Sequence, residues 1–129
     1  MNPFAPKLLA LVAAGGAAGS LLRYAVGVWC GAWFGAALPW GTLAVNVAGS
    51  AAIGLLGGLM LGGMPLSQEA RLLAMTGFLG GFTTFSAFSL DIGTLFLRHP
   101  ALAAGYLGLT LVGGLAAFAL AFALGRSLA

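Results

Sequence analysis

The stretch of sequence that decides the fold reads Gly77-Phe78-Leu79-Gly80-Gly81-Phe82-Thr83-Thr84-Phe85-Ser86-Ala87-Phe88-Ser89. It lies in the middle of an apolar segment long enough to cross a bilayer. Paired glycines weaken a helix, since each costs roughly 1 kcal/mol relative to alanine in a helix interior. An interruption of a spanning helix is tolerated only where protein buries it or water lines it, and it frees backbone groups that bind ions. The stretch therefore predicts a broken spanning helix with an ion site.

Composition identifies the broad class of the chain. Of its 129 residues, 61% are hydrophobic and 5% are charged, whereas a soluble domain has about 25% charged residues. A spanning helix needs about 20 mostly apolar residues, and four such segments fit. We predict an all-α integral membrane protein with a single four-helix transmembrane domain over residues 1–129. The predicted spans are about 6–29, 42–61, 70–97 and 101–124, with a connector over 31–41 and an N-cap region at 67–69.

What the sequence lacks excludes several classes of function. One histidine and two acids make no Ser/His/Asp arrangement and no metal-binding cluster, so an enzyme is not expected. The net charge of +3 is small and spread out, which does not indicate a nucleic-acid partner. The single cysteine, Cys30, excludes an intramolecular disulfide.

The positive charges bear on how the chain inserts into the membrane. The N-terminus, the second connector and the C-terminus share one side and carry Lys7, Arg71 and Arg126, whereas the other side carries Arg23 and Arg98. Three charges against two is close to a balance, and an imbalance is what fixes orientation. We therefore expect insertion both ways and an antiparallel homodimer with a two-fold axis in the membrane plane.

Glycine spacing predicts how the helices pack. Pairs at the small-xxx-small spacing are Gly15/Gly19, Gly54/Gly58, Gly58/Gly62 and Gly77/Gly81. This spacing lets helix backbones approach closely in lipid, so we interpret most of these glycines as packing residues. Gly80 and Gly81 are the exception, because they adjoin the hydroxyl cluster.

Asn46 and three phenylalanines are candidates for binding a small anion. The Asn46 amide lies inside the second span, where it either donates to an anion or forms an interhelical hydrogen bond; the sequence leaves both open. Phe82, Phe85 and Phe88 recur every three residues, so they are expected to line one side of the segment after the glycines. Their ring edges carry partial positive charge, although core or lipid-facing rings are the alternative. An uncharged site suits conduction, because the ion must also leave.

Hydroxyl groups extend this set of candidates. Those at membrane depth in the third span belong to Thr83, Thr84, Ser86 and Ser89. Serine and threonine in membrane helices often bond to their own backbone, so a role in ion binding is one of two readings. Tyr106 and Thr110 lie four residues apart on the fourth span, where they either form a polar track or, for Tyr106, an interfacial anchor.

Two charged residues within the spans have alternative roles. Arg23, placed near the end of the first span, either extends its charge to the membrane interface or draws anions toward a vestibule. Asp91 is a functional candidate because it is a carboxylate in a membrane segment. It is alternatively a structural partner of Arg23 or Arg98.

Three stretches together resemble the Fluc family of fluoride channels, also called the CrcB family. They are Gly19-Ser20-Leu21-Leu22-Arg23-Tyr24, Gly41-Thr42-Leu43-Ala44-Val45-Asn46, and Gly77 through Ser89 with Asp91. The resemblance covers all four spans, and the third stretch is the most specific. It implies a dual-topology antiparallel homodimer with two fluoride pores, in the cell's inner membrane as a multi-pass protein.

The resemblance also implies roles for individual residues. The pore residues would be Asn46, Phe85, Ser86, Phe88, Tyr106 and Thr110. No pore role transfers to Phe82, which precedes the threonine pair. A structural sodium ion at the dimer centre would be held by the carbonyls of Gly80 and Thr83, two from each subunit. Asp91 departs from the glutamate that is frequent in relatives, and Arg23 would make the vestibule favourable to anions.

The implied function is passive export of cytoplasmic fluoride, which enters cells as neutral HF and ionises inside. A small dual-topology proton-coupled exporter of drugs or cations is the alternative, but it requires a membrane acid in the first two spans, which contain none. A non-transporting assembly subunit is a third reading, and it leaves the hydroxyl-rich interruption unexplained. Exchange of Asp91 for asparagine separates the channel from the coupled exporter.

Overall fold

The computed structural model describes residues 2–129 and consists of helices. Their bounds are α1 Pro6–Phe34, α2 Trp40–Leu61, α3 Gln68–Arg71, the π-helical segment η1 Leu72–Leu79, α4 Gly80–Phe82, α5 Phe85–Arg98 and α6 Pro100–Leu128. Four stretches are long and apolar enough to cross a membrane: α1, α2, the composite segment Gln68–Arg98, and α6. The prediction of an all-α, multi-pass membrane protein is therefore confirmed.

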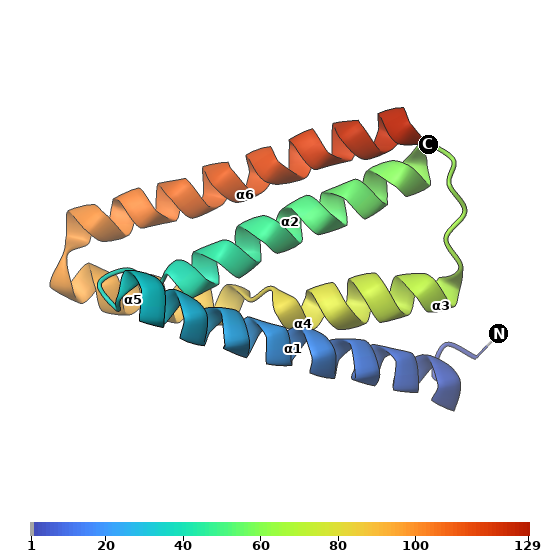
Figure 1. Cartoon of the computed structure of the whole chain (residues 1–129), viewed down its shortest axis with the longest axis horizontal. Helices are drawn as coiled ribbons and strands as arrows, with labels where there is room; N and C mark the ends of the chain where they lie inside the picture. Colours follow the sequence, from blue (N-terminus) through green and yellow to red (C-terminus); the bar gives the residue numbers. More distant parts are fainter. Residues whose placement is uncertain (1) are drawn as a thin grey trace.

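The helices run back and forth between two ends of the molecule. Figure 1 shows the N-terminus, the connector between α2 and α3, and the C-terminus at one end, with the connections α1–α2 and α5–α6 at the other. Helix α6 lies along α2, and α1 lies along the composite third segment. The third segment consequently meets α1 through η1 and α4, and meets α6 through α5.

Helix α1 is longer than the sequence suggested. It continues to Phe34 and ends at Gly35, whose φ of +78° is left-handed and whose N–H donates to the Gly31 carbonyl at 3.0 Å. Because α2 begins at Trp40, the connector expected over residues 31–41 is reduced to residues 35–39. The glycine at position 31 did not stop the helix, since only the left-handed glycine that follows ends it.

Close contacts between helices occur where glycine has no side chain. A Cβ atom placed on Gly54 would lie 2.5 Å from the Phe118 carbonyl oxygen of α6, and one on Gly77 would lie 2.9 Å from the Val12 carbonyl oxygen of α1. Real Cβ atoms do not come so close to backbone oxygen, so α2 with α6 and α1 with η1 pack at distances that glycine alone permits. The glycine spacing therefore predicted the packing faces of both pairs.

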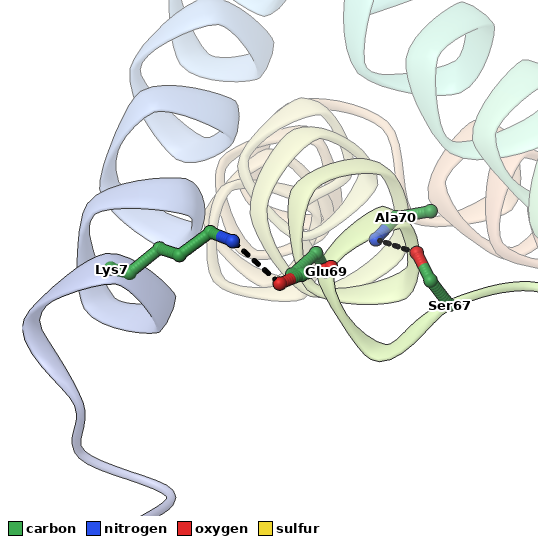
Figure 2. A network of polar contacts seen from close by, with 4 residues as sticks. All are labelled: Lys7, Ser67, Glu69 and Ala70. Atoms are coloured by element: carbon green, nitrogen blue, oxygen red, sulfur yellow. Dashed lines mark hydrogen bonds and ion pairs between the residues drawn. The ribbon is translucent and has the colours of Figure 1, made fainter.

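The end of the molecule that carries both termini holds a helix cap and an ion pair. The hydroxyl of Ser67 accepts a hydrogen bond from the Ala70 N–H at 3.1 Å and caps α3, as the sequence predicted. Next to this cap, the Lys7 ammonium pairs with the Glu69 carboxylate at 2.7 Å between two exposed side chains (Figure 2). The pair joins the start of α1 to the start of the third segment.

Large apolar side chains cover much of the surface. Leu120 of α6 is 74% exposed, and Leu21 of α1 is 70% exposed. A soluble protein rarely exposes continuous apolar faces of this kind, and lipid or another protein chain would cover them in a membrane. The buried core is correspondingly small and centred on Val45 and Leu95, each 1% exposed.

Candidate functional site

Two threonines separate α4 from α5. Thr83 (φ −86°, ψ 158°) and Thr84 (φ −153°, ψ 127°) are extended, so the helical hydrogen bonding stops between the two helices. The Thr84 hydroxyl accepts a hydrogen bond from the Ala87 N–H at 3.2 Å and caps α5. The Thr83 hydroxyl donates to the Leu79 carbonyl at 2.9 Å. Both side chains thus satisfy backbone groups at the two new helix ends.

Asn46 of α2 bonds to both backbone groups of one residue in this interruption. Its Nδ2 donates to the Thr84 carbonyl at 2.9 Å, and its Oδ1 accepts from the Thr84 N–H at 2.8 Å. The amide therefore acts as an interhelical clamp, which was one of the two readings left open by the sequence. One N–H of the amide remains for another acceptor, so the clamp does not exclude contact with an anion.

The clamp and the cap change the bonding of two carbonyls. In a continuous helix the Thr84 N–H would bond to the Gly80 carbonyl, and the Ala87 N–H would bond to the Thr83 carbonyl. Here those two N–H groups donate to Asn46 and to the Thr84 hydroxyl instead. The carbonyls of Gly80 and Thr83 lose their helical donors, and carbonyl oxygens are ligands that suit a hard cation such as sodium.

Arg23 of α1 reaches the same interruption from the opposite side. Its Nε donates to the Gly81 carbonyl at 3.1 Å in a partly buried position. Because α1 extends to Phe34, Arg23 lies about 16 Å from the end of its helix at 1.5 Å per residue. The expectation that it lies near a helix end is therefore wrong, and its head group bonds to backbone inside the protein.

A cavity of about 410 Å³ lies between α2, the third segment and α6. Its lining includes Asn46, Gly80, Thr83, Phe85, Phe88 and Thr110. The Phe85 ring is 76% exposed and the Phe88 ring is 5% exposed, with their centroids 5.9 Å apart. The Thr110 hydroxyl is buried and has no hydrogen-bond partner in residues 2–129. Aromatic edges, an amide and an unpartnered hydroxyl therefore meet in one space.

Phe82 does not belong to the same row of rings. It stacks on Phe78, with centroids 5.9 Å apart, and packs in a core cluster with Val45 and Leu79. The spacing of three residues between Phe82 and Phe85 is not helical, because the extended threonines lie between them. The expectation that all three phenylalanines line one side is thus wrong for Phe82.

Tyr106 lies beside this cavity without lining it. Its hydroxyl donates to the Pro39 carbonyl at 2.9 Å, and its ring lies 6.0 Å from that of Phe88. The residue is 4% exposed, which is incompatible with the alternative of an interfacial anchor. Ser86 is exposed and lies 3.4 Å from the Thr84 hydroxyl, also outside the lining.

Asp91 lines a second cavity of about 300 Å³ near the α1–α2 connection, together with Thr42, Thr94 and Arg98. Its Oδ2 is buried and has no hydrogen-bond partner in the described chain. Among residues 2–129, the ion pair whose nitrogen and oxygen lie within 4.0 Å is that of Lys7 with Glu69. The expected structural pair of Asp91 with Arg23 or Arg98 is therefore not formed. Neither Asp91 nor Arg23 lines the larger cavity.

Ser50 is a site residue that the sequence reasoning missed. It lines the 410 Å³ cavity and lies one helical turn after Asn46. The spacing of four residues from Asn46 was a signal that placed it on the same face. The Arg23 contact with Gly81 was also missed, and no spacing in the sequence indicates it.

Four apolar helices and a partly polar cavity beside the interrupted segment define a small multi-pass membrane protein with a candidate ion site. The sequence model described as CrcB-like protein, Camphor Resistance (CrcB), matches residues 10–122. The chain belongs to this family.

Curated relatives cover most of the chain. A protein of Rhizobium leguminosarum named fluoride-specific ion channel FluC is 54% identical over 92% of this chain and 96% of its own length. Its namesake in Agrobacterium fabrum is 53% identical over 93% of this chain and 97% of its own length. A third, from Rhodospirillum centenum, is 50% identical over 71% of this chain and 73% of its own length. The family resemblance inferred from the motifs is confirmed.

Proposed function

We propose that this chain is a fluoride-selective channel that exports cytoplasmic fluoride passively across the cell's inner membrane, and not an enzyme. The observation that carries the proposal is the 410 Å³ cavity that brings Asn46, Phe85, Phe88 and Thr110 together at the interrupted segment. The relatives that match over nearly their full length are named for this activity. Membership of the family makes the same function the simplest reading of this cavity.

The cavity supplies partial positive charge without a cation. The rings of Phe85 and Phe88 offer positive edges, and the Thr110 hydroxyl, which has no partner in residues 2–129, offers a donor. Asn46 retains one amide N–H after bonding to Thr84. A fluoride ion that loses its hydration shell would exchange water for these weaker contacts, which lets it leave again. Ser86 and Tyr106, which lie outside the lining of the cavity, would extend the same path.

The proposal includes a homodimer in which the two copies lie antiparallel. The 410 Å³ cavity is open on one side, and the Phe85 ring beside it is 76% exposed. A second copy related by a two-fold axis in the membrane plane would cover this side and complete the wall of the path. Such an axis, passing beside the interruption, would bring the two interrupted segments next to each other.

A sodium ion at this axis fits the carbonyls of Gly80 and Thr83. Their helical donors are directed elsewhere, and two copies would present four oxygens. Groups of three or more His, Cys, Asp or Glu residues that would hold a metal by side chains are absent from residues 2–129. When bound, the ion would supply structural cross-linking and positive potential. The chain's own contribution is to fix the backbone at the interruption through Asn46 and Arg23.

The distribution of positive charge between the two ends of the molecule argues against insertion in both orientations. Because Arg23 bonds inside the protein, the ends carry Lys7, Arg71 and Arg126 against Arg98, which is three against one. This difference favours one orientation. Tags on the C-terminus, read in inner-membrane vesicles, test this part of the proposal: the antiparallel dimer requires both orientations, and a single orientation would replace it with a parallel dimer.

The test is ion efflux from proteoliposomes that hold purified protein, read with fluoride- and chloride-selective electrodes. Fast fluoride efflux with negligible chloride efflux is expected, and Asn46→Asp should abolish it. Absence of fluoride efflux from well-folded native protein would overturn the proposal. Asp91→Asn is the companion variant, since it should abolish proton-coupled exchange but leave a fluoride leak.

A further inference from the structure

We infer that Ser50 is a fluoride-binding residue of the same path, an inference that rests on the proposed function. Ser50 lines the 410 Å³ cavity together with Asn46 and Thr110. It lies one turn after Asn46 on α2, so both side chains leave the helix on one face. The fluoride path would then continue along α2 beyond Asn46, which bonds to the interruption.

The hydrogen bonding of the other hydroxyls distinguishes Ser50. Serine and threonine in membrane helices commonly donate to a preceding carbonyl, and four residues do so here. They are Thr83, Ser89, Thr94 and Ser127. Ser50 makes no such bond in residues 2–129, and neither does Thr110, whose hydroxyl is buried without a partner. These two hydroxyls keep their protons available inside the cavity.

An anion in the cavity needs donors besides Asn46, because the Asn46 amide is largely used by the protein backbone. The Asn46 amide exchanges two hydrogen bonds with the Thr84 backbone, which leaves it one N–H. An anion that has left water needs several donors at once, because burying a charge without them is costly. Ser50 and Thr110, on neighbouring helices, line the cavity with hydroxyls that donate to no group in residues 2–129.

Gly114 leaves the space that the Ser50 hydroxyl faces. It lies one turn after Thr110 on α6, and a Cβ atom placed on it would lie 3.6 Å from the Ser50 Oγ. This is an ordinary van der Waals distance, so a small side chain fits at position 114 without displacing backbone. A hydroxyl can therefore be moved from α2 to α6 while it stays in the same part of the cavity.

The experiment compares three variants with native protein in the proteoliposome assay, after size-exclusion chromatography shows each to be monodisperse. Ser50→Ala should slow fluoride efflux about tenfold, since a hydrogen bond to an ion contributes roughly that much or more. Adding Gly114→Ser to Ser50→Ala should restore most of the rate. Ser127→Ala, which removes a hydroxyl bonded to the Leu124 carbonyl far from the cavity, is the matched control and should leave the rate unchanged.

The outcomes separate this inference from the proposed function. If native protein moves fluoride and Ser50→Ala moves it equally fast, the inference is wrong and the channel assignment stands. A monodisperse double variant no faster than Ser50→Ala also overturns the inference, because the lost donor would then not act in the shared cavity. If native protein moves no fluoride, the proposed function itself fails before any variant is compared.

Discussion

Removal of the Asn46 side chain should open the interruption of the third segment. The amide makes two hydrogen bonds to Thr84, at 2.9 and 2.8 Å. Each contributes about 1 kcal/mol net, and leaving a half-buried peptide group unpaired costs about 1–3 kcal/mol. Asn46→Ala should therefore destabilise the local structure by about 2–4 kcal/mol, which corresponds to a roughly 30- to 900-fold larger open population. Asn46→Asp keeps the acceptor, loses the donor, and sets a carboxylate oxygen against the Thr84 carbonyl.

The assay is amide hydrogen exchange on protein in nanodiscs, followed in the peptides that contain Thr84. Both variants should exchange faster at this position, with Asn46→Ala the faster, while peptides around Ser127 serve as the internal control and keep the native rate. Fluoride efflux, measured on the same preparations, should fall in both variants. Native exchange at Thr84 in Asn46→Ala would refute the clamp, and Asn46 would then matter only as an ion ligand.

Three further predictions follow from the packing and the surface. Gly58→Ala should lower the thermal unfolding midpoint of the purified protein by several degrees, because a Cβ atom there collides with a backbone carbonyl of α6. Gly57→Ala is the control: its Cβ atom meets only the Phe122 ring at 3.7 Å, so the change should be tolerated. Phe85→Ile and Phe88→Ile should both slow fluoride efflux, but only the change at Phe88, which is 5% exposed, should also reduce stability; equal rates to native would remove the phenylalanines from the path. Lys7→Ala breaks an ion pair between exposed side chains and should change stability by less than about 1 kcal/mol, with efflux unchanged.

The sequence predicted the site less completely than the fold, because spacing does not give hydrogen-bond partners. Asn46 was identifiable as a candidate, but its bonds to the Thr84 backbone depend on a residue 38 positions away. The same holds for Arg23, whose contact with Gly81 spans 58 positions. Ser50 was within reach of sequence reasoning, since it follows Asn46 by one helical turn.

The sequence by itself determined the class of the protein and the packing faces of its helices. Four long apolar runs with few charges have to span a membrane, and glycines such as Gly54 and Gly77 permit contacts that no other residue permits. Only the tertiary structure decided where the polar groups are used. It separated Phe82 from Phe85 through the extended threonines, placed Phe88 against Tyr106, and gathered donors from three separate segments around one cavity. Local pattern fixes secondary structure and burial, whereas a binding site depends on which distant segments the fold brings together.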